Sequence, residues 1–310
     1  MFEEYGFPAE YPVEGRASIA DLFKPEHRCG IYILHFKNDQ YYAGLAIDVV
    51  RRYAQHRLNH TDIVKISFKT VPQLSLSEEE RSLIWTLERQ NFVLRNITFT
   101  SLPPTESDFD LIMPLAVQQA WLQGHDLPDT DSERIVAPER RLKYTAHYQR
   151  LLRQPEVKLV IDVLRTYAQI GIPIRRRSEI SFWCSSCLPT PHVFSRININ
   201  WQEVLTVYRR TDGAIWSSFH LAASPITALS DSDLEQLTPW DSAGYSTDHY
   251  YEPGGQDQLH VEIPIEDMLR FLAEPAIQSS IRLFNWRLMK KGPCIFGRYH
   301  CLDLADHLVD

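Results

Sequence analysis

The strongest constraint on the fold is a pair of apolar runs joined by four turn-forming residues. Residues 30–36 read GIYILHF, residues 41–46 read YYAGLA, and KNDQ lies between them. β-Branched and aromatic residues favour extended strands, whereas Asn and Asp favour tight turns. The sequence therefore predicts an antiparallel β-hairpin near the start of the chain.

Two helices and a third strand are expected after this hairpin. Asp48 can cap a helix over residues 49–57. Residues 62–71, DIVKISFKTV, alternate apolar and polar side chains as a half-buried strand does. Ser77 and Glu80 then fit a capping box that opens a second helix. The first hundred residues are thus predicted to be β-β-α-β-α.

The rest of the chain predicts a second region of mixed α+β structure. The best candidate for a linker is SLPPTESDFD at 101–110, which is rich in proline and small polar residues. The elements expected beyond it are helices on either side of Pro155, strands over 178–186 and 258–265, a hairpin over 203–222 and a helical stretch over 266–291.

Composition narrows the setting in which the protein works. No stretch approaches the ~18 uncharged apolar residues of a membrane span. The N-terminus is acidic and contains prolines, unlike a signal peptide. Five cysteines in 310 residues do not resemble a disulfide framework. We therefore expect a cytoplasmic protein with no membrane partner.

Charge is distributed unevenly along the chain. The formal net charge is −8, yet residues 140–210 carry +9 and residues 211–280 carry −11. Clustered Lys and Arg attract phosphate backbones, so the basic block is the candidate contact for a nucleic acid. Arg175, Arg176 and Arg177 are its sharpest part. An equally weighted alternative is that the two blocks pair with each other inside the fold.

Several polar side chains of the first region are expected on one face. Arg52 and His56 are four residues apart, which places them on the same side of a helix. Tyr32 and Tyr42 lie on adjacent strands of the hairpin and could project toward that side. Glu88 lies among apolar residues of the second helix, where a carboxylate needs a cation or metal. Such a set suits phosphodiester hydrolysis: a base for water, a guanidinium for phosphate and a carboxylate for Mg²⁺.

The order and spacing of these residues resemble a known family. GIY at 30–32 is followed by YAG at 42–44, then by Arg52, His56 and a helix with Glu88. This pattern is similar to the GIY-YIG nuclease superfamily. The similarity covers about a third of the chain, and the C-terminal half shows no such resemblance.

The resemblance implies a role for each side chain. The cofactor would be Mg²⁺ (or Mn²⁺) with Glu88 as its ligand, and Asn96 would be a further site residue, with Asn91 as the alternative. A frame shifted by two residues would instead align Gln90 with the metal glutamate; Glu88 is preferred because it shares a helical stripe with Ile84. The remaining implied roles are activation or positioning of water by Tyr32, contact with phosphate by Tyr42, phosphate binding by Arg52 and a hydrogen bond from His56 to a tyrosine.

These expectations describe an α+β protein. An N-terminal arm (1–27) precedes a GIY-YIG nuclease domain (28–105) with a small antiparallel sheet flanked by helices. A linker and helix (106–139) lead to a C-terminal α+β domain (140–310) that would recognise a target or a protein partner. The implied activity is a Mg²⁺-dependent endonuclease acting on nucleic acid, DNA before RNA, in restriction, antiviral (phage) defence, mobile elements or repair. The alternative is a non-catalytic module that keeps the fold and binds nucleic acid or protein.

The cysteines raise one more question. Cys184 and Cys187, in the run WCSSC, have the spacing of half a zinc site. We expect a buried, reduced pair, with structural zinc as the alternative, because no familiar zinc pattern completes the set. The further ligands that zinc could use are His192, Cys294, His300 and Cys301.

Overall fold

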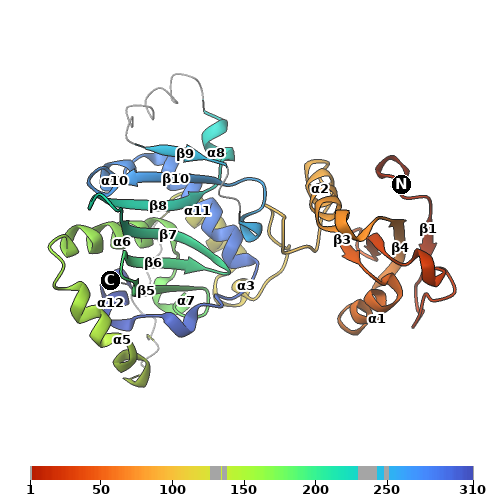
Figure 1. The fold of residues 1–310 in the computed structure, drawn as a ribbon, viewed down its shortest axis with the longest axis horizontal. Coiled ribbons are helices and arrows are strands. Elements are labelled where there is room, and N and C mark those ends of the chain that lie inside the picture. Colours follow the sequence, from red (N-terminus) through yellow and green to blue (C-terminus); the bar gives the residue numbers. More distant parts are fainter. Residues whose placement is uncertain (1, 126–133, 135–137, 230–242, 248–250, 310) are drawn as a thin grey trace. The chain divides into compact units, whose positions relative to one another are not determined.

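The protein divides into two compact units, each with its own antiparallel sheet. The computed structural model describes residues 2–125, 134, 138–229, 243–247 and 251–309 (Figure 1). The units comprise Met1–Pro104 and Thr105–Asp310, so the division lies within the expected linker at 101–110. Both units mix helices and strands. In the described part of the chain, no helix combines the length and apolar character needed to cross a membrane.

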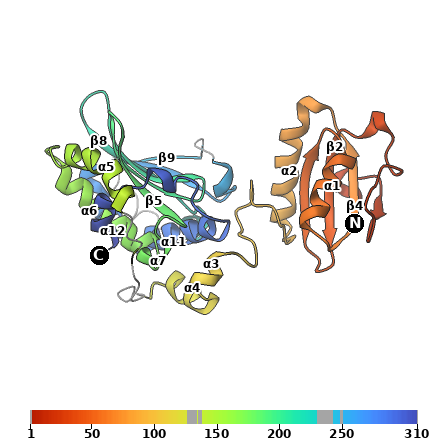
Figure 2. The ribbon, with the colours of Figure 1, turned by 90° about the horizontal axis from the view of Figure 1, so that it is seen from below.

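The first unit is a four-stranded sheet between two helices. Strand β2 (Gly30–Phe36) lies between β3 (Tyr41–Ala46) and β4 (Ile63–Thr70), and β1 (Glu10–Pro12) lies outside β4. All seven residues of β2 are buried because α1 (Val49–Asn59) and α2 (Leu76–Arg89) flank the sheet (Figure 2). The predicted hairpin, helix and third strand are all present.

The predicted arm at 1–27 is an integral part of this unit. Strand β1 pairs with β4, and Glu10 lies opposite Ser67. Phe2 is buried in the apolar cluster beneath α2, whereas Ile19 is buried in the cluster beneath α1. Both faces of the sheet are therefore completed by residues that precede the hairpin.

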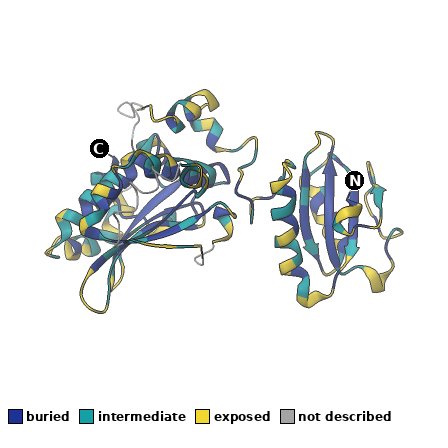
Figure 3. Ribbon diagram, turned by 90° about the horizontal axis from the view of Figure 1, so that it is seen from above, coloured by how far each residue is buried: buried dark blue, intermediate teal, exposed yellow. Residues whose placement is uncertain are grey.

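The second unit is a six-stranded antiparallel sheet with its large helices on one face. The strand order is β5-β6-β7-β8-β10-β9. Alternate residues of the strands, such as Leu205, Val207 and Phe219, face the apolar core, while Thr206 and Tyr208 face away from it (Figure 3). The strands are β5 (Trp183–Thr190), β6 (Val193–Ile199), β7 (Gln202–Arg209), β8 (Ile215–Leu221), β9 (Gly244–Ser246) and β10 (Leu259–Pro264).

The helices of this unit supply most of its core. The described helices are α3 (Phe109–Ile112), α4 (Leu115–Leu122), α5 (Pro138–Leu151), α6 (Val157–Gly171), α7 (Arg175–Ser178), α8 (Ser224–Thr227), α10 (Ile265–Phe271), α11 (Pro275–Lys290) and α12 (Leu302–Val309). Helix α6 ends at Gly171, as predicted, and the predicted hairpin forms from β7 and β8. Strand β6 was not expected, and β5 begins at Trp183 rather than at residue 178.

Candidate functional site

The hydroxyl of Tyr32 lies at the centre of the polar cluster in the first unit. Its oxygen is 2.7 Å from His56 Nε2 and 3.2 Å from Arg52 Nε. A guanidinium only donates, so the Tyr32 oxygen accepts from Arg52, and its own proton is free to be donated to His56 in the tautomer that leaves Nε2 without a hydrogen. Arg52 and His56 reach the same atom because they are one helical turn apart on α1.

Tyr42 completes an aromatic wall around this hydroxyl. Its ring stacks on that of Tyr32 with centroids 6.2 Å apart, and the His56 ring lies 4.7 Å from it. Gly44 is the cross-strand partner of Tyr32. A Cβ at Gly44 would lie 2.5 Å from the Tyr32 oxygen, so only glycine leaves room for the phenol. The glycine of YAG is thus explained by contact with the tyrosine of GIY.

Burial sets the protonation of this cluster. It lowers the pKa of His56 to about 4, and the positive charges of Arg52 and His60 act in the same direction. His56 is therefore neutral at pH 7 and can accept a proton at Nε2. Burial also raises the pKa values of Tyr32 and Tyr42, against the opposing charge of Arg52. Tyr32 keeps its proton in the resting protein and can pass it only to His56.

The carboxylate nearest to this cluster is Glu80, which the sequence analysis assigned to a capping box. Its Oε1 accepts a hydrogen bond of 3.1 Å from the backbone amide of Leu45. Its negative charge contributes to the raised pKa values of Tyr32 and Tyr42. The capping box does not form, since α2 starts at Leu76 and its N-cap residue, Ser75, makes no side-chain cap. Glu80 is turned instead toward the edge of β3.

The structure does not bring Glu88 to the cluster. Its Oε1 accepts hydrogen bonds from the backbone amides of Ser101 (2.7 Å) and Leu102 (2.8 Å). Glu80 and Glu88 are eight residues apart on one helix, which is about 12 Å along its axis. The two carboxylates therefore lie at different places along the helix, and it is Glu80, not Glu88, that reaches strand β3. Gln90, the frame-shifted alternative, is exposed and accepts a hydrogen bond from the Tyr5 hydroxyl.

Asn96 lies beside the cluster and holds the backbone of β3. Its Oδ1 accepts from the Ala43 amide at 3.0 Å, and its Nδ2 donates to the Ala43 carbonyl at 2.8 Å. Ala43 lies between Tyr42 and Gly44, so Asn96 positions both. Asn91, the alternative, adopts a φ of 64° directly after α2 and serves as a helix terminator.

Glu80 and Asn96 both bind backbone amides on the outer edge of β3. That strand is the last in its sheet, so the amides of every second residue face outward. The Ala43 amide is bound by Asn96 and the Leu45 amide by Glu80. Both side chains therefore bind the edge of β3 that faces away from β2. Tyr42 belongs to the same strand. A sequence signal for Glu80 did exist, because it lies four residues from both Leu76 and Ile84 on the buried stripe of α2.

A magnesium ion fits the donor chemistry of this cluster. Mg²⁺ retains several waters and needs only one or two protein carboxylates, and Glu80 supplies one. Within the described ranges, no group of three or more His, Cys, Asp or Glu side chains forms a dense metal cage. At this cluster Glu80 would be the protein ligand of a hydrated Mg²⁺ or Mn²⁺.

The arginine triplet lies in the second unit and is not uniformly exposed. Arg175 and Arg176 are half-buried, Arg177 is exposed, and the Arg175 carbonyl accepts from the Trp183 indole. The ion pair between Arg210 and Glu262 joins the basic block (140–210) to the acidic block (211–280). Other basic residues pair within their own block, as Arg209 does with Glu156, or with α12, as Arg141 does with Asp303.

Four of the five cysteines lie in two close pairs. All five are free thiols, and Cys184 Sγ lies 3.6 Å from Cys294 Sγ. Cys187 interacts with Cys301. His300, another suggested zinc ligand, instead lies 2.8 Å from a carboxylate oxygen of the buried Glu179.

Comparison with known proteins adds no assignment. No family model matches the sequence, and neither the curated proteins nor the solved structures contain a match. The functional conclusion below therefore depends on the side-chain geometry and on the resemblance of the motifs.

Proposed function

We propose that the first unit is the catalytic domain of a Mg²⁺-dependent endonuclease that hydrolyses phosphodiester bonds in nucleic acid. DNA is the expected substrate, and RNA is the alternative. The observation that supports this most directly is the Tyr32 hydroxyl, which is held between a neutral imidazole and a guanidinium. Tyr42 and Glu80 complete the cluster, so it contains a proton path, a phosphate-binding cation and a carboxylate.

The geometry supports a proton relay. A water molecule beside Tyr32 would lose its proton to the phenol oxygen as the phenol proton moves 2.7 Å to His56 Nε2. This order suits a phenol with a raised pKa, because Tyr32 never has to exist as a free phenolate. The relay keeps charge low in a buried place until substrate arrives.

Arg52 and Glu80 would act on the phosphate itself. The Arg52 side chain uses Nε for Tyr32 and one terminal nitrogen for Gln55, and the residue is exposed, so its remaining donors can meet a phosphate. Glu80 would hold Mg²⁺, which supplies positive charge beside the scissile phosphate. The second unit would recognise the nucleic acid or a protein partner. The resemblance leaves restriction, phage defence, mobile elements and repair open as settings.

The direct test is cleavage by the full chain of plasmid, single-stranded DNA, branched DNA and RNA, with Mg²⁺, Mn²⁺ or a chelator. We expect metal-dependent cleavage that Tyr32→Phe abolishes. Tyr41→Phe is the matched control, because Tyr41 belongs to the same hairpin but packs on the opposite face of the sheet, in the cluster beneath α2. Binding without cleavage of any of these substrates would instead support the alternative, a non-catalytic binding module.

A further inference from the structure

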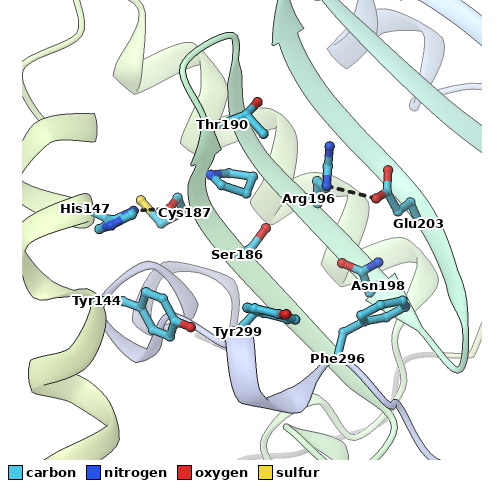
Figure 4. A pocket seen from close by; sticks show the side chains of 11 residues that line it. Tyr144, His147, Ser186, Cys187, Thr190, Arg196, Asn198, Glu203, Phe296 and Tyr299 are labelled. Atoms are coloured by element: carbon cyan, nitrogen blue, oxygen red, sulfur yellow. Dashed lines mark hydrogen bonds and ion pairs between the residues drawn. The ribbon is translucent and has the colours of Figure 1, made fainter.

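A cavity of about 460 Å³ lies in the second unit, far along the chain from the tyrosine cluster. It opens between strands β5, β6 and β7, helix α5 and the turn at residues 296–299 (Figure 4). Its volume falls within the ~300–1,000 Å³ of typical small-ligand pockets. The proposed chemistry of the first unit does not use any of its residues.

Two buried polar side chains in this cavity lack partners. The residue Ser186 is only 8% exposed, and its buried hydroxyl makes no hydrogen bond. Asn198, 5% exposed, makes no side-chain hydrogen bond within the described part of the chain. An unpaired buried polar group costs about 1–3 kcal/mol. Such groups indicate a site that is completed by a ligand with donors and acceptors of its own.

Aromatic rings form the opposite wall. Tyr144 comes from α5, and Phe296 and Tyr299 come from the turn that covers this part of the sheet (Figure 4). Tyr144 is fixed by donating its hydroxyl proton to the Arg298 carbonyl. Tyr299 is 42% exposed, so one side of its ring is available to a planar ligand. Flat rings opposite hydrogen-bonding groups suit a flat heteroaromatic ligand.

The charge of the cavity argues against a polyphosphate ligand. Arg196 is its one Lys or Arg, and its terminal nitrogen is 3.0 Å from Glu203. The guanidinium is thereby neutralised, although its Nε is buried without a partner. A neutral, planar group with hydrogen-bonding edges therefore fits better than a free phosphate. Nucleobases have this character, since the Watson–Crick edge of each base places a donor next to an acceptor, as the Asn198 amide does.

The tip of the β6–β7 hairpin, whose strands line the cavity, adds a further aromatic side chain. Trp201, at the tip of the β6–β7 hairpin, is 62% exposed, and Ile295 is 52% exposed. They are neighbours, because the Ile295 amide donates to the carbonyl of Asn200. Exposed apolar side chains beside a base-sized cavity can stack against the nucleotides that flank a captured base.

We propose that this cavity binds one unpaired nucleobase of a nucleic-acid strand. The base would stack on Tyr299 and Phe296 and pair its edge with the Asn198 amide. The cavity would thus direct the protein to nucleic acid with an unstacked base, such as a bulge, a mismatch or a single strand. This inference rests on the proposed nucleic-acid substrate, and the experiment below separates the two.

The test is equilibrium binding of the full chain, in chelator, to two fluorescent DNA duplexes. One carries a single unpaired adenine, and the other carries an abasic residue at the same place. We expect the base-bearing duplex to bind about tenfold more tightly, the effect of stacking one base on an aromatic side chain. Tyr299→Ala and Asn198→Asp should each remove most of that preference. Tyr245→Ala, an exposed tyrosine on the far edge strand of the same sheet, should keep it.

Equal affinity of the wild-type protein for both duplexes, or no binding to either, overturns the inference. A preference that survives both Tyr299→Ala and Asn198→Asp also overturns it. Tight binding of adenosine monophosphate without any preference between the duplexes would show a free-nucleotide site and reject the strand-bound base. Metal-dependent cleavage without base preference would leave the nuclease proposal standing and reject only the cavity's role. Base preference without cleavage would support the cavity's role and reject the nuclease proposal.

Discussion

The Tyr32 oxygen and His56 Nε2 are 2.7 Å apart, and this contact joins the central strand of the first sheet to helix α1. Strand β2 sets the position of the phenol, and the helical turn between Arg52 and His56 sets its two partners. One short contact therefore links the fold of the unit to the protonation of its polar cluster.

The first prediction concerns stability and pH. His56 has a pKa of about 4 in the folded protein against an ordinary value of 6.5. Between these values the unfolded chain takes up a proton that the folded chain does not, so stability rises with pH across this window. The contribution is fully present above pH 6.5 and is lost as the pH falls toward 4. Urea unfolding of the wild-type protein should show a loss of about 3 kcal/mol from this group between pH 7 and pH 4.

The control for this prediction is a set of His→Gln variants. His56→Gln should be less stable than wild type at pH 7 but should lose less stability on acidification. His35→Gln should also flatten the pH dependence, because burial lowers its pKa to about 4 as well. A His56→Gln profile parallel to that of wild type would show that His56 is not held neutral.

The second prediction separates the two glutamates of α2. Glu80→Gln should lower metal-dependent cleavage by about a hundredfold or more, the scale for losing one electrostatic contact to a transition state. Glu88→Gln should keep most activity, since an amide oxygen can still accept from Ser101 and Leu102. Initial rates across a Mg²⁺ titration measure both. If Glu88→Gln were inactive and Glu80→Gln active, the assignment from the sequence resemblance would be restored.

The two glutamates also show which features of the site can be predicted from the sequence and which cannot. The hairpin and α1 could be predicted because their signals are local: Asp48 accepts from the Val50 and Arg51 amides, as an N-cap residue does. The buried stripe of α2 marks Glu80, but its partner could not be predicted, because a carboxylate near the start of a helix can fold back on its own helix or reach a neighbouring strand. Which of these two contacts forms depends on where the edge of β3 lies, and that position is set by tertiary packing rather than by the local sequence.

The same physical reason explains the other differences. The segment at 1–27 carries breaking prolines and weak periodicity, yet Phe2 and Ile19 are buried by contacts distant in sequence. Helix α2 ends at Arg89 because Asn91 adopts a left-handed conformation. Strand β6 follows a proline-rich turn and carries Arg196 and Asn198 on the face that forms the cavity, so it lacks a strong apolar pattern.

The third prediction uses the glycine under Tyr32. Gly44→Ala places a Cβ 2.5 Å from the Tyr32 oxygen and 3.0 Å from Tyr42 Cε1, so both rings must move. We expect a cost of about 1–3 kcal/mol in unfolding free energy together with a severe loss of cleavage. Gly244→Ala is the matched control, because its Cβ meets nothing closer than 4.0 Å. Full activity in a folded Gly44→Ala protein would show that the Tyr32 position is not needed.

The fourth prediction concerns the residue that holds β3 in place. Asn96→Asp replaces the Nδ2 donor with an oxygen that faces the Ala43 carbonyl, in a residue only 4% exposed. Leaving that carbonyl unpaired beside a buried charge should cost about 2–3 kcal/mol. Hydrogen exchange in the peptide covering 41–46 should rise, because repulsion between the new carboxylate oxygen and the Ala43 carbonyl pushes the side chain away from the Ala43 amide as well.

Cleavage should fall together with this local opening, since Tyr42 and Gly44 flank the residue that Asn96 holds. Asn91→Asp is the control, as its side chain lies on the surface after α2 and should change neither exchange nor rate. Asn96 would be a positioning residue if the variant loses turnover in proportion to the mobility of β3. Loss of cleavage with unchanged exchange at 41–46 would instead place Asn96 in contact with the substrate.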